Sequence, residues 1–391
     1  MPYMPRQIEA RNYILYYKRT DFRPFSITPI CYIVDMNPYS RLPFYLILFS
    51  ILILVSCSKR MYLTGGTETV LYPSPPDTAR IQFLTRFSNS SDIAGEHSKF
   101  KTFIAGAENP LPIVKPYGLA VQKGKLFIAD AGIAGLQVID LDKNSFEYFI
   151  PGGRGKLKLP INCFIDKGGN LFVTDVLRKQ VVVFNEKLEY KGEIGGGEDF
   201  KPADVYVIGD TILITDPNNN RINVYDTLSS QPIFSFPVGA KVGDMNWLYN
   251  PLNLCVKEDK IYVTDFGDSR IKIFSMKGEY INSIGSYGKG LGQFVRPKGI
   301  DVDHENNLYV VDAGFENVQI FNYTGQLLMF FGGPYNGPGD MYLPAKVTID
   351  YNNVSYFEKY VDPAFDLKYL IYVVNQYGPD KVTVFGRIKS K

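Results

Sequence analysis

Few side chains in this sequence are of the types that perform covalent or metal chemistry. The chain contains 2 histidines, His97 and His304, so a three-histidine zinc site cannot be built from it. Cys163 and Cys255 follow a proline by three and four residues, which in alternating strands points them to opposite faces. No histidine lies beside either cysteine to activate it, and no disulfide is expected between them. We predict that both are small core residues.

Acidic residues paired with arginine recur at a fixed spacing. Asp216 and Arg221 are five residues apart, as are Asp265 and Arg270. An opposed carboxylate and guanidinium at this spacing would brace a hairpin. We therefore predict that both are structural pairs.

Calcium is the metal for which the sequence offers the best case. Asp204 and Asp301 could contribute carboxylates to such a site, although hydrated surface carboxylates are the simpler explanation. The asparagines at 218–220 follow one aspartate, a poor cage for an ion that takes six to eight oxygens. We expect no metal and no cofactor, with calcium as the alternative.

Cys57 ends an apolar run that begins at Leu42 and is followed at once by polar and basic residues. The run is 16 residues long, whereas a membrane-spanning helix needs roughly 20. Its length suits the apolar core of a secretory signal, about 7 to 15 residues behind a positive charge, here Arg41. The alternative is a buried cysteine at the end of an anchor helix.

The residues Leu54-Val55-Ser56-Cys57 resemble the lipobox of bacterial lipoproteins. In that family the signal is cut just before the cysteine, whose thiol and amine are then acylated. The resemblance therefore implies lipidation of Cys57 and a lipid-anchored protein of the bacterial cell envelope, on the periplasmic or outer-membrane side where there are two membranes.

The sequence before the folded part divides into three segments. Met36 gives a signal peptide of ordinary length, 36–56, so residues 1–35 are predicted to be a mis-assigned upstream start or unstructured. Residues 57–79 are polar with Gly and Pro, as expected of a tether.

Composition indicates a folded domain without a strong charge. The chain has 391 residues, 45% hydrophobic and 14% aromatic, enough to bury a sizeable core. Segment 1–56 carries 6 Lys and Arg and 3 Asp and Glu, so its removal leaves 36 basic against 37 acidic residues, about −1. Such a protein has no general attraction for nucleic acid, and we expect no nucleic-acid partner.

A short apolar sequence motif, which we predict to form a strand and which usually ends in aspartate, recurs from about residue 111 onward. Its copies occupy 126–130, 171–175, 212–216, 261–265, 308–312 and 371–375. A proline that opens another apolar strand precedes each copy; the prolines are Pro116, Pro160, Pro202, Pro251, Pro297 and Pro344, spaced 44, 42, 49, 46 and 47 residues apart. A period in the forties with short β-rich phrases is typical of propeller blades.

Each unit reads as four strands, and its pattern resembles NHL repeats: P-x-G-I-A-V-D, then L-Y-V-A-D, then N-R-I-Q-V-F. The match covers about residues 80–391 and is clearest in 216–226 and 265–274. The resemblance implies an all-β, six-bladed β-propeller of four-stranded NHL-like blades, with structural roles for the Asp–Arg pairs. Some relatives are amidating lyases or calcium-dependent lactonases, so an enzyme stays among the alternatives.

The sixth unit lacks a fourth strand. An open ring would expose strand edges that invite aggregation. A strand predicted at 80–88 has no blade of its own, so we expect it to complete blade six and close the ring. Blade six also holds an aromatic-rich insertion within 351–369, where a long hairpin is favoured over a partner-binding flap.

Two sets of loops should emerge on one side of the ring, here called the loop-rich face. They join second to third strands, and fourth strands to the next inner strand. Aromatic and basic residues gather in them, and such residues are the usual anchors of interfaces. The predicted contact residues are Arg154, Lys156, Arg178, Lys179, Tyr287, Lys289, Arg296 and Tyr335. Trp247, Phe294 and Tyr342, in the same loops, are expected to be buried between blades.

The sequence thus predicts a membrane-tethered propeller that binds another envelope protein, a peptide or a glycan on its loop-rich face, without catalysis. The alternative is a calcium-dependent enzyme similar to the lactonases or lyases. RNA binding, which animal NHL domains perform, is not expected of an exported protein.

Overall fold

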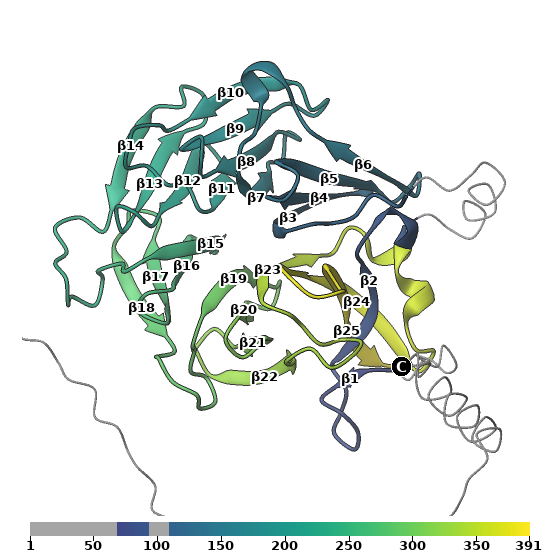
Figure 1. Ribbon diagram of the computed structural model, residues 1–391. Helices are drawn as coiled ribbons and strands as arrows, with labels where there is room; N and C mark the ends of the chain where they lie inside the picture. The colour runs from purple at the N-terminus through teal and green to yellow at the C-terminus, as the bar shows by residue number, and fades with distance from the viewer. Residues whose placement is uncertain (1–68, 94–108) are drawn as a thin grey trace, which may run out of the picture. The chain divides into compact units, whose positions relative to one another are not determined.

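The computed structural model describes residues 69–93 and 109–391. Six antiparallel sheets stand around a central axis as the blades of a propeller (Figure 1). The predicted six-bladed β-propeller is thereby confirmed. Cys57, the segments 1–35 and 36–56, and His97 lie outside the described residues. Within the described part, no helix has the length and apolar character needed to span a bilayer.

Blades one to five each contain four strands that follow chain order from the axis outward. Blade one consists of β3 (Pro116–Gln122), β4 (Lys125–Asp130), β5 (Gly135–Asp140) and β6 (Ser145–Phe149). Blade two consists of β7 (Pro160–Ile165), β8 (Leu171–Asp175), β9 (Gln180–Phe184) and β10 (Tyr190–Ile194). Blade three consists of β11 (Val205–Ile208), β12 (Thr211–Asp216), β13 (Arg221–Asp226) and β14 (Pro232–Phe236). Blades four and five consist of β15 (Pro251–Lys257), β16 (Lys260–Asp265), β17 (Arg270–Ser275) and β18 (Tyr280–Ile284); and β19 (Pro297–Val302), β20 (Leu308–Asp312), β21 (Asn317–Phe321) and β22 (Leu327–Gly332).

Blade six is built from both ends of the described chain. It contains β23 (Pro344–Asp350), β24 (Phe365–Asn375) and β25 (Val382–Ser390), with β2 (Ile81–Phe87) on the outer side of β25. β2 runs antiparallel to β25, with Ile81 opposite Arg387 and Phe87 opposite Val382. The predicted closure of the ring by an N-terminal strand is confirmed.

The sheet of blade six extends into the segment predicted as a tether. β1 (Leu71–Tyr72) pairs with β2 as a fifth strand, and the Tyr72 ring lies 6.1 Å from that of Phe331. Folded structure therefore begins before residue 80. Two residues are too few to give a strand pattern in the sequence, and this is why the pattern missed β1.

Burial follows each strand's position in its blade. Every residue of β8 and of β20 is buried, because these central strands are covered by neighbouring blades on both faces. The outer strand β10 alternates between partly buried and exposed residues up to Ile194, which is buried. The core accordingly consists of layers between adjacent sheets, such as the one holding Leu126 of blade one and Tyr372 of blade six.

The second strand of each blade ends on a buried Asp or Asn. Its side chain accepts hydrogen bonds from the backbone of the segment that leads into the inner strand. Asp130 accepts the backbone N–H groups of Val114 and Lys115 at 2.7 and 2.9 Å. Asp312 does the same for Val295 and Arg296 at 2.7 and 3.0 Å. The aspartate of the repeated phrase thus ties each second strand to the segment that opens its own blade.

The predicted Asp–Arg pairs have different outcomes. Arg221 Nε lies 3.6 Å from Asp216 Oδ2. The predicted pair of Asp265 and Arg270 is wrong, because Asp265 pairs with Lys272 at 3.0 Å and Arg270 turns to Asp268 at 2.6 Å. Lys272 is 1% exposed, and a buried ammonium requires a carboxylate more than a half-exposed guanidinium does.

One apolar side chain from each connection between blades is buried beneath the loop-rich face. These residues are Ile113, Leu157, Phe200, Leu248, Phe294 and Met341. The predicted burial of Phe294 is confirmed, but Leu248 and Met341 take the positions expected for Trp247 and Tyr342, and Tyr342 is 45% exposed. The buried residue usually stands three before the proline that opens the blade, one position away from those two aromatics.

The insertion in blade six is a bridge to blade one. It contains the 3-10 turns η4 (Val354–Tyr356) and η5 (Glu358–Tyr360) rather than a plain hairpin. Asn353 accepts the N–H of Gly124 at 2.7 Å and donates to the carbonyl of Gln122 at 3.0 Å. Phe357 is 2% exposed in the core between these blades. The segment therefore seals the junction where the ring closes.

Candidate functional site

The channel along the propeller axis is lined by the six inner strands and encloses about 240 Å³. Most of the residues that line it are apolar, with Leu119, Tyr206 and Ile300 contributed by different blades. Asp301 and Lys346 are the charged residues among those that line it. The channel is thus a place where a ligand could bind, as is the loop-rich face.

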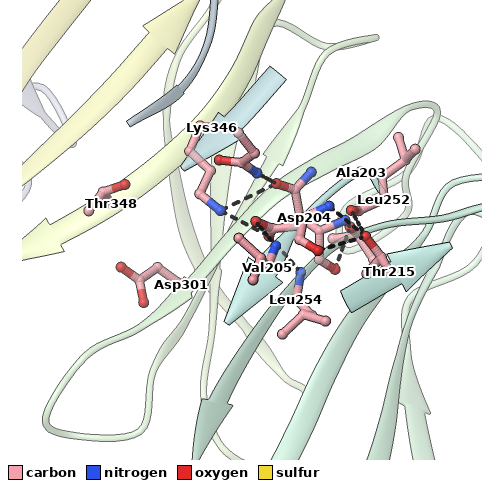
Figure 2. A network of polar contacts seen from close by, with 12 residues as sticks. Ala203, Asp204, Val205, Thr215, Leu252, Leu254, Asp301, Lys346 and Thr348 are labelled. Atoms are coloured by element: carbon pink, nitrogen blue, oxygen red, sulfur yellow. Dashed lines mark hydrogen bonds and ion pairs between the residues drawn. The ribbon is translucent and has the colours of Figure 1, made fainter. Parts of the chain in front are cut away.

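Lys346 of β23 forms an ion pair across the channel with Asp204, which lies just before β11 (Figure 2). Lys346 Nζ is 3.1 Å from Asp204 Oδ2 and 3.4 Å from Asn253 Oδ1. Asp204 is 1% exposed and also accepts the backbone N–H groups of Val205 and Leu254, at 2.9 and 3.0 Å. Burial raises the pKa of Asp204, and Lys346 and these hydrogen bonds oppose that rise. The pair connects blade six with blades three and four.

Asp301 of β19 lies apart from this ion pair (Figure 2). Its carboxylate accepts the backbone N–H groups of Val302 and Ile349, both at 2.8 Å. Burial raises the pKa of Asp301 to about 6, against the opposing effect of these hydrogen bonds. Each carboxylate oxygen has a backbone donor, and one of the two bonds joins blade five to blade six.

The carboxylates in the channel do not fit a calcium site. Calcium takes six to eight oxygen ligands, whereas the oxygens of Asp204 and Asp301 already hold backbone N–H groups and the Lys346 ammonium. Within 69–93 and 109–391, no three His, Cys, Asp or Glu side chains converge as metal ligands. The expectation that Asp204 is a hydrated surface carboxylate is wrong, because Asp204 is buried and pairs with Lys346.

The remaining reactive side chains have structural surroundings. Cys163 and Cys255 are free thiols, each 3% exposed, as predicted for core residues. Burial raises the pKa of both, that of Cys163 to about 12, so neither forms a thiolate near neutral pH. The imidazole of His304 is stacked on the ring of Tyr351 at 3.6 Å in the turn after β19.

Four predicted contact residues lie close together on blade two, but two of them brace the fold. Arg154 and Lys156 are exposed in the β6–β7 connection. Arg178 donates to the backbone carbonyls of both, each at 2.8 Å, and to Glu193 at 2.7 Å. Lys179 donates to a backbone carbonyl of the β10–β11 connection. Arg154 and Lys156 are thus the members with side chains open to a partner.

The other predicted contact residues come from two further connections. Tyr287, Lys289 and Arg296, between β18 and β19, are exposed, Tyr287 at 72%. Tyr335, between β22 and β23, is partly buried and hydrogen-bonds to Asp380. The predicted set is therefore divided between separate parts of the loop-rich face and does not form one patch.

Tyr287 was predicted as a contact residue, but the other exposed apolar residues in two loops of the loop-rich face were missed by the sequence analysis. They lie in what we call the apolar loop pair, the connections 237–250 and 285–296 on either side of blade four. Its exposed large apolar members, with exposed fractions, are Val238 at 80%, Val242 at 73%, Met245 at 66%, Tyr249 at 37%, Tyr287 at 72% and Leu291 at 82%. Their only signal in the sequence is the presence of large apolar residues in glycine-containing loops.

Comparison with known proteins supports the fold. A family described as a 6-bladed beta-propeller matches residues 243–355. No curated protein sequence is significantly similar to the chain. Among solved structures, a structural genomics protein of unknown function from Bacteroides thetaiotaomicron VPI-5482 has 14% identity and a TM-score of 0.52, with 79% of this chain and 76% of that chain covered.

Two lyase structures overlap less closely with this chain. Virginiamycin B lyase from Staphylococcus aureus has 14% identity and a TM-score of 0.49, covering 78% of this chain and 98% of its own. A streptogramin B lyase structure has 14% identity and a TM-score of 0.49, covering 72% and 85%. Similarity at this level concerns the fold alone.

Proposed function

We propose that this chain is a membrane-tethered, non-enzymatic propeller of the NHL type that binds another envelope protein, a peptide or a glycan on its loop-rich face. The observation that carries the proposal is the apolar loop pair. The two loops expose several large apolar side chains to solvent, and exposed apolar surface of this kind often marks interaction sites in soluble proteins.

The energetics favour burial of this surface by a partner. Met245, Tyr287 and Leu291 are each more than half exposed. Complete burial of such side chains contributes roughly 1.5–3 kcal/mol each before the costs of association. Tyr287 also offers a hydroxyl group at the edge of the patch, and tyrosine is enriched among residues that dominate binding energy.

The proposed tether would keep the propeller near the membrane. The described fold begins at residue 69, so at most the residues from Cys57 to that point separate the proposed lipid from the ring. A chain of this length reaches about 40 Å when fully extended, at 3.3–3.6 Å per residue. A partner in or near the same membrane is therefore the expected kind. Loss of membrane association in Cys57→Ser tests the tether separately.

Site-specific photo-crosslinking in the native cells tests the docking face. Tyr287 is replaced by benzoylphenylalanine in the full-length protein; Tyr323, 78% exposed in the β21–β22 turn on the opposite face, is the matched control. We expect a discrete crosslinked product from position 287 and none from position 323. Identical products from both positions would reject the loop-rich face as the docking surface.

The alternative is a calcium-dependent lactonase- or lyase-like enzyme. The feature that favours it is the cavity lined by Asp301, although the donor set described above does not fit calcium. Metal analysis after dialysis against calcium separates the two functions. Stoichiometric calcium, together with turnover of lactone or peptide substrates, would favour the enzyme.

A further inference from the structure

A second pocket lies at the end of the channel beneath the loop-rich face and encloses about 130 Å³. Its polar lining includes Tyr117, Asn162, Asn253, Lys298 and Gln376. Most of these residues stand at the first positions of inner strands, where the chain enters each blade from the loops. The pocket is distinct from the larger cavity, which is lined by later positions of the same strands.

Lys298 brings an unpaired positive charge to this pocket. Within the described part of the chain, its ammonium group has no ion pair and no hydrogen bond. Burial, with a smaller effect of the nearby Arg296, lowers the pKa of Lys298 to about 8, so it is still mainly charged at neutral pH. Tyr117 is the other titratable side chain in the lining. A partly buried ammonium without a counter-ion favours an anionic ligand.

Asn253, in the lining of the same pocket, supplies an oriented hydrogen-bond donor. Its Oδ1 accepts Asn162 Nδ2 at 3.1 Å and Lys346 Nζ at 3.4 Å. Because both neighbours are donors, the amide can be placed in only one way, with Nδ2 turned away from them. No acceptor contacts Asn253 Nδ2 among the residues that the structure describes. These two hydrogen bonds thus fix the direction in which the amide donates.

The same pocket has no negative charge of its own. Neither Asp nor Glu is among its lining residues, and the nearest carboxylate of the network, that of Asp204, is already neutralised by Lys346. One ammonium and one amide donor match a single planar monoanion. A phosphate dianion is usually held by several cations or by a series of backbone N–H groups.

From this geometry we propose that the mouth of the channel is a carboxylate-binding site, in which Lys298 supplies the charge and Asn253 a hydrogen bond. The carboxylate belongs either to a small free organic acid or to an acidic side chain of a peptide that enters from the loop-rich face. The site does not depend on the apolar loop pair and can exist whether or not that surface binds a partner.

Ligand-observed NMR titration of the full-length protein at pH 7 tests the proposal. The probes are acetate, N-acetyl-glutamate amide, its neutral counterpart N-acetyl-glutamine amide, and inorganic phosphate. We expect the glutamate probe to bind at least tenfold more tightly than the glutamine probe and than phosphate. Equal binding of acetate and the glutamate probe would identify a small acid as sufficient, whereas tighter binding of the glutamate probe would identify a peptide side chain.

Variants assign the binding to Lys298. Lys298→Met should weaken the glutamate probe at least tenfold, and Lys298→Arg should retain most of the affinity because the charge is kept. Lys277→Met, an exposed lysine in the β17–β18 turn on the opposite face, is the control and should bind as the wild type does. Circular dichroism verifies that each variant is folded. Wild-type affinity in Lys298→Met, or equal affinity for the charged and neutral probes, would overturn the proposal.

Discussion

The buried ion pair in the channel gives a sharp prediction about stability. Lys346→Met removes the ammonium that lies 3.1 Å from Asp204 while keeping an unbranched apolar stem of similar length. The carboxylate left behind is 1% exposed and retains its two backbone hydrogen bonds. Breaking a buried pair by removing one partner costs about 3–5 kcal/mol, and we expect a loss in this range at pH 8.

The loss should depend on pH, with a sign that follows from Asp204. Its pKa is raised by burial in the folded protein, and removal of Lys346 raises it further. Below that raised value the folded carboxyl group is protonated, whereas the unfolded one ionises down to about pH 4. Acidification therefore favours the folded variant, by up to about 1.4 kcal/mol per pH unit in this window. The destabilisation should be clearly smaller at pH 5 than at pH 8.

Guanidinium unfolding followed by circular dichroism measures both effects. Lys289→Met is the control, since an exposed lysine away from such a network should change stability by less than about 0.5 kcal/mol. If Lys346→Met matched this control at pH 8, or lost the same free energy at pH 5 and pH 8, the assigned role of the pair would be refuted.

Three further predictions concern the ring and the mouth of the channel. Gly299→Ala should destabilise the protein by about 1–3 kcal/mol in the same unfolding assay, because its Cβ would lie 2.5 Å from a backbone atom of β23; Gly192→Ala, with open space around it, should be neutral. Binding of the glutamate probe should be strongest between about pH 5 and 7, where its carboxylate is ionised and Lys298 is charged, and should fall by up to about tenfold per unit above pH 8 as Lys298 loses its proton; a flat profile from pH 7 to 9 would contradict this. Deletion through Ser88 should expose the edge of β25 and produce aggregates in analytical ultracentrifugation, whereas deletion through residue 68 should leave a monodisperse protein.

The repeats explain why so much of the fold could be predicted. A blade is encoded locally, by a proline, two apolar phrases and their turns within a few tens of residues, so periodicity alone indicates six blades. Closure by the strand near residue 81 followed from a simple count of strands. β1 could not be found in this way, because a two-residue strand has no period.

The candidate site was harder to predict, because its contacts join residues that do not occupy equivalent positions in the repeated blades. Lys346 and Asp204 are 142 residues apart and occupy different places in their blades. Likewise, the choice of Lys272 over Arg270 as partner of Asp265 depends on which cation is buried, a property of the assembled sheet. Exposure in the apolar loop pair also depends on loop paths that the alternation of strands does not determine.

The closure of the ring has a consequence for how the protein is made. β2 cannot pair with β25 until the end of the chain has been made, because paired residues such as Phe87 and Val382 are separated in the sequence by almost the whole fold. Until β25 is synthesised, the side of β2 that faces β25 stays unpaired and the edge of blade six stays open. Contacts of such long range slow folding and prolong the exposure of unpaired strands. Only a chain that contains β25 can therefore complete the ring. A chain truncated before Val382 keeps an unpaired strand edge that chaperones and proteases can recognise.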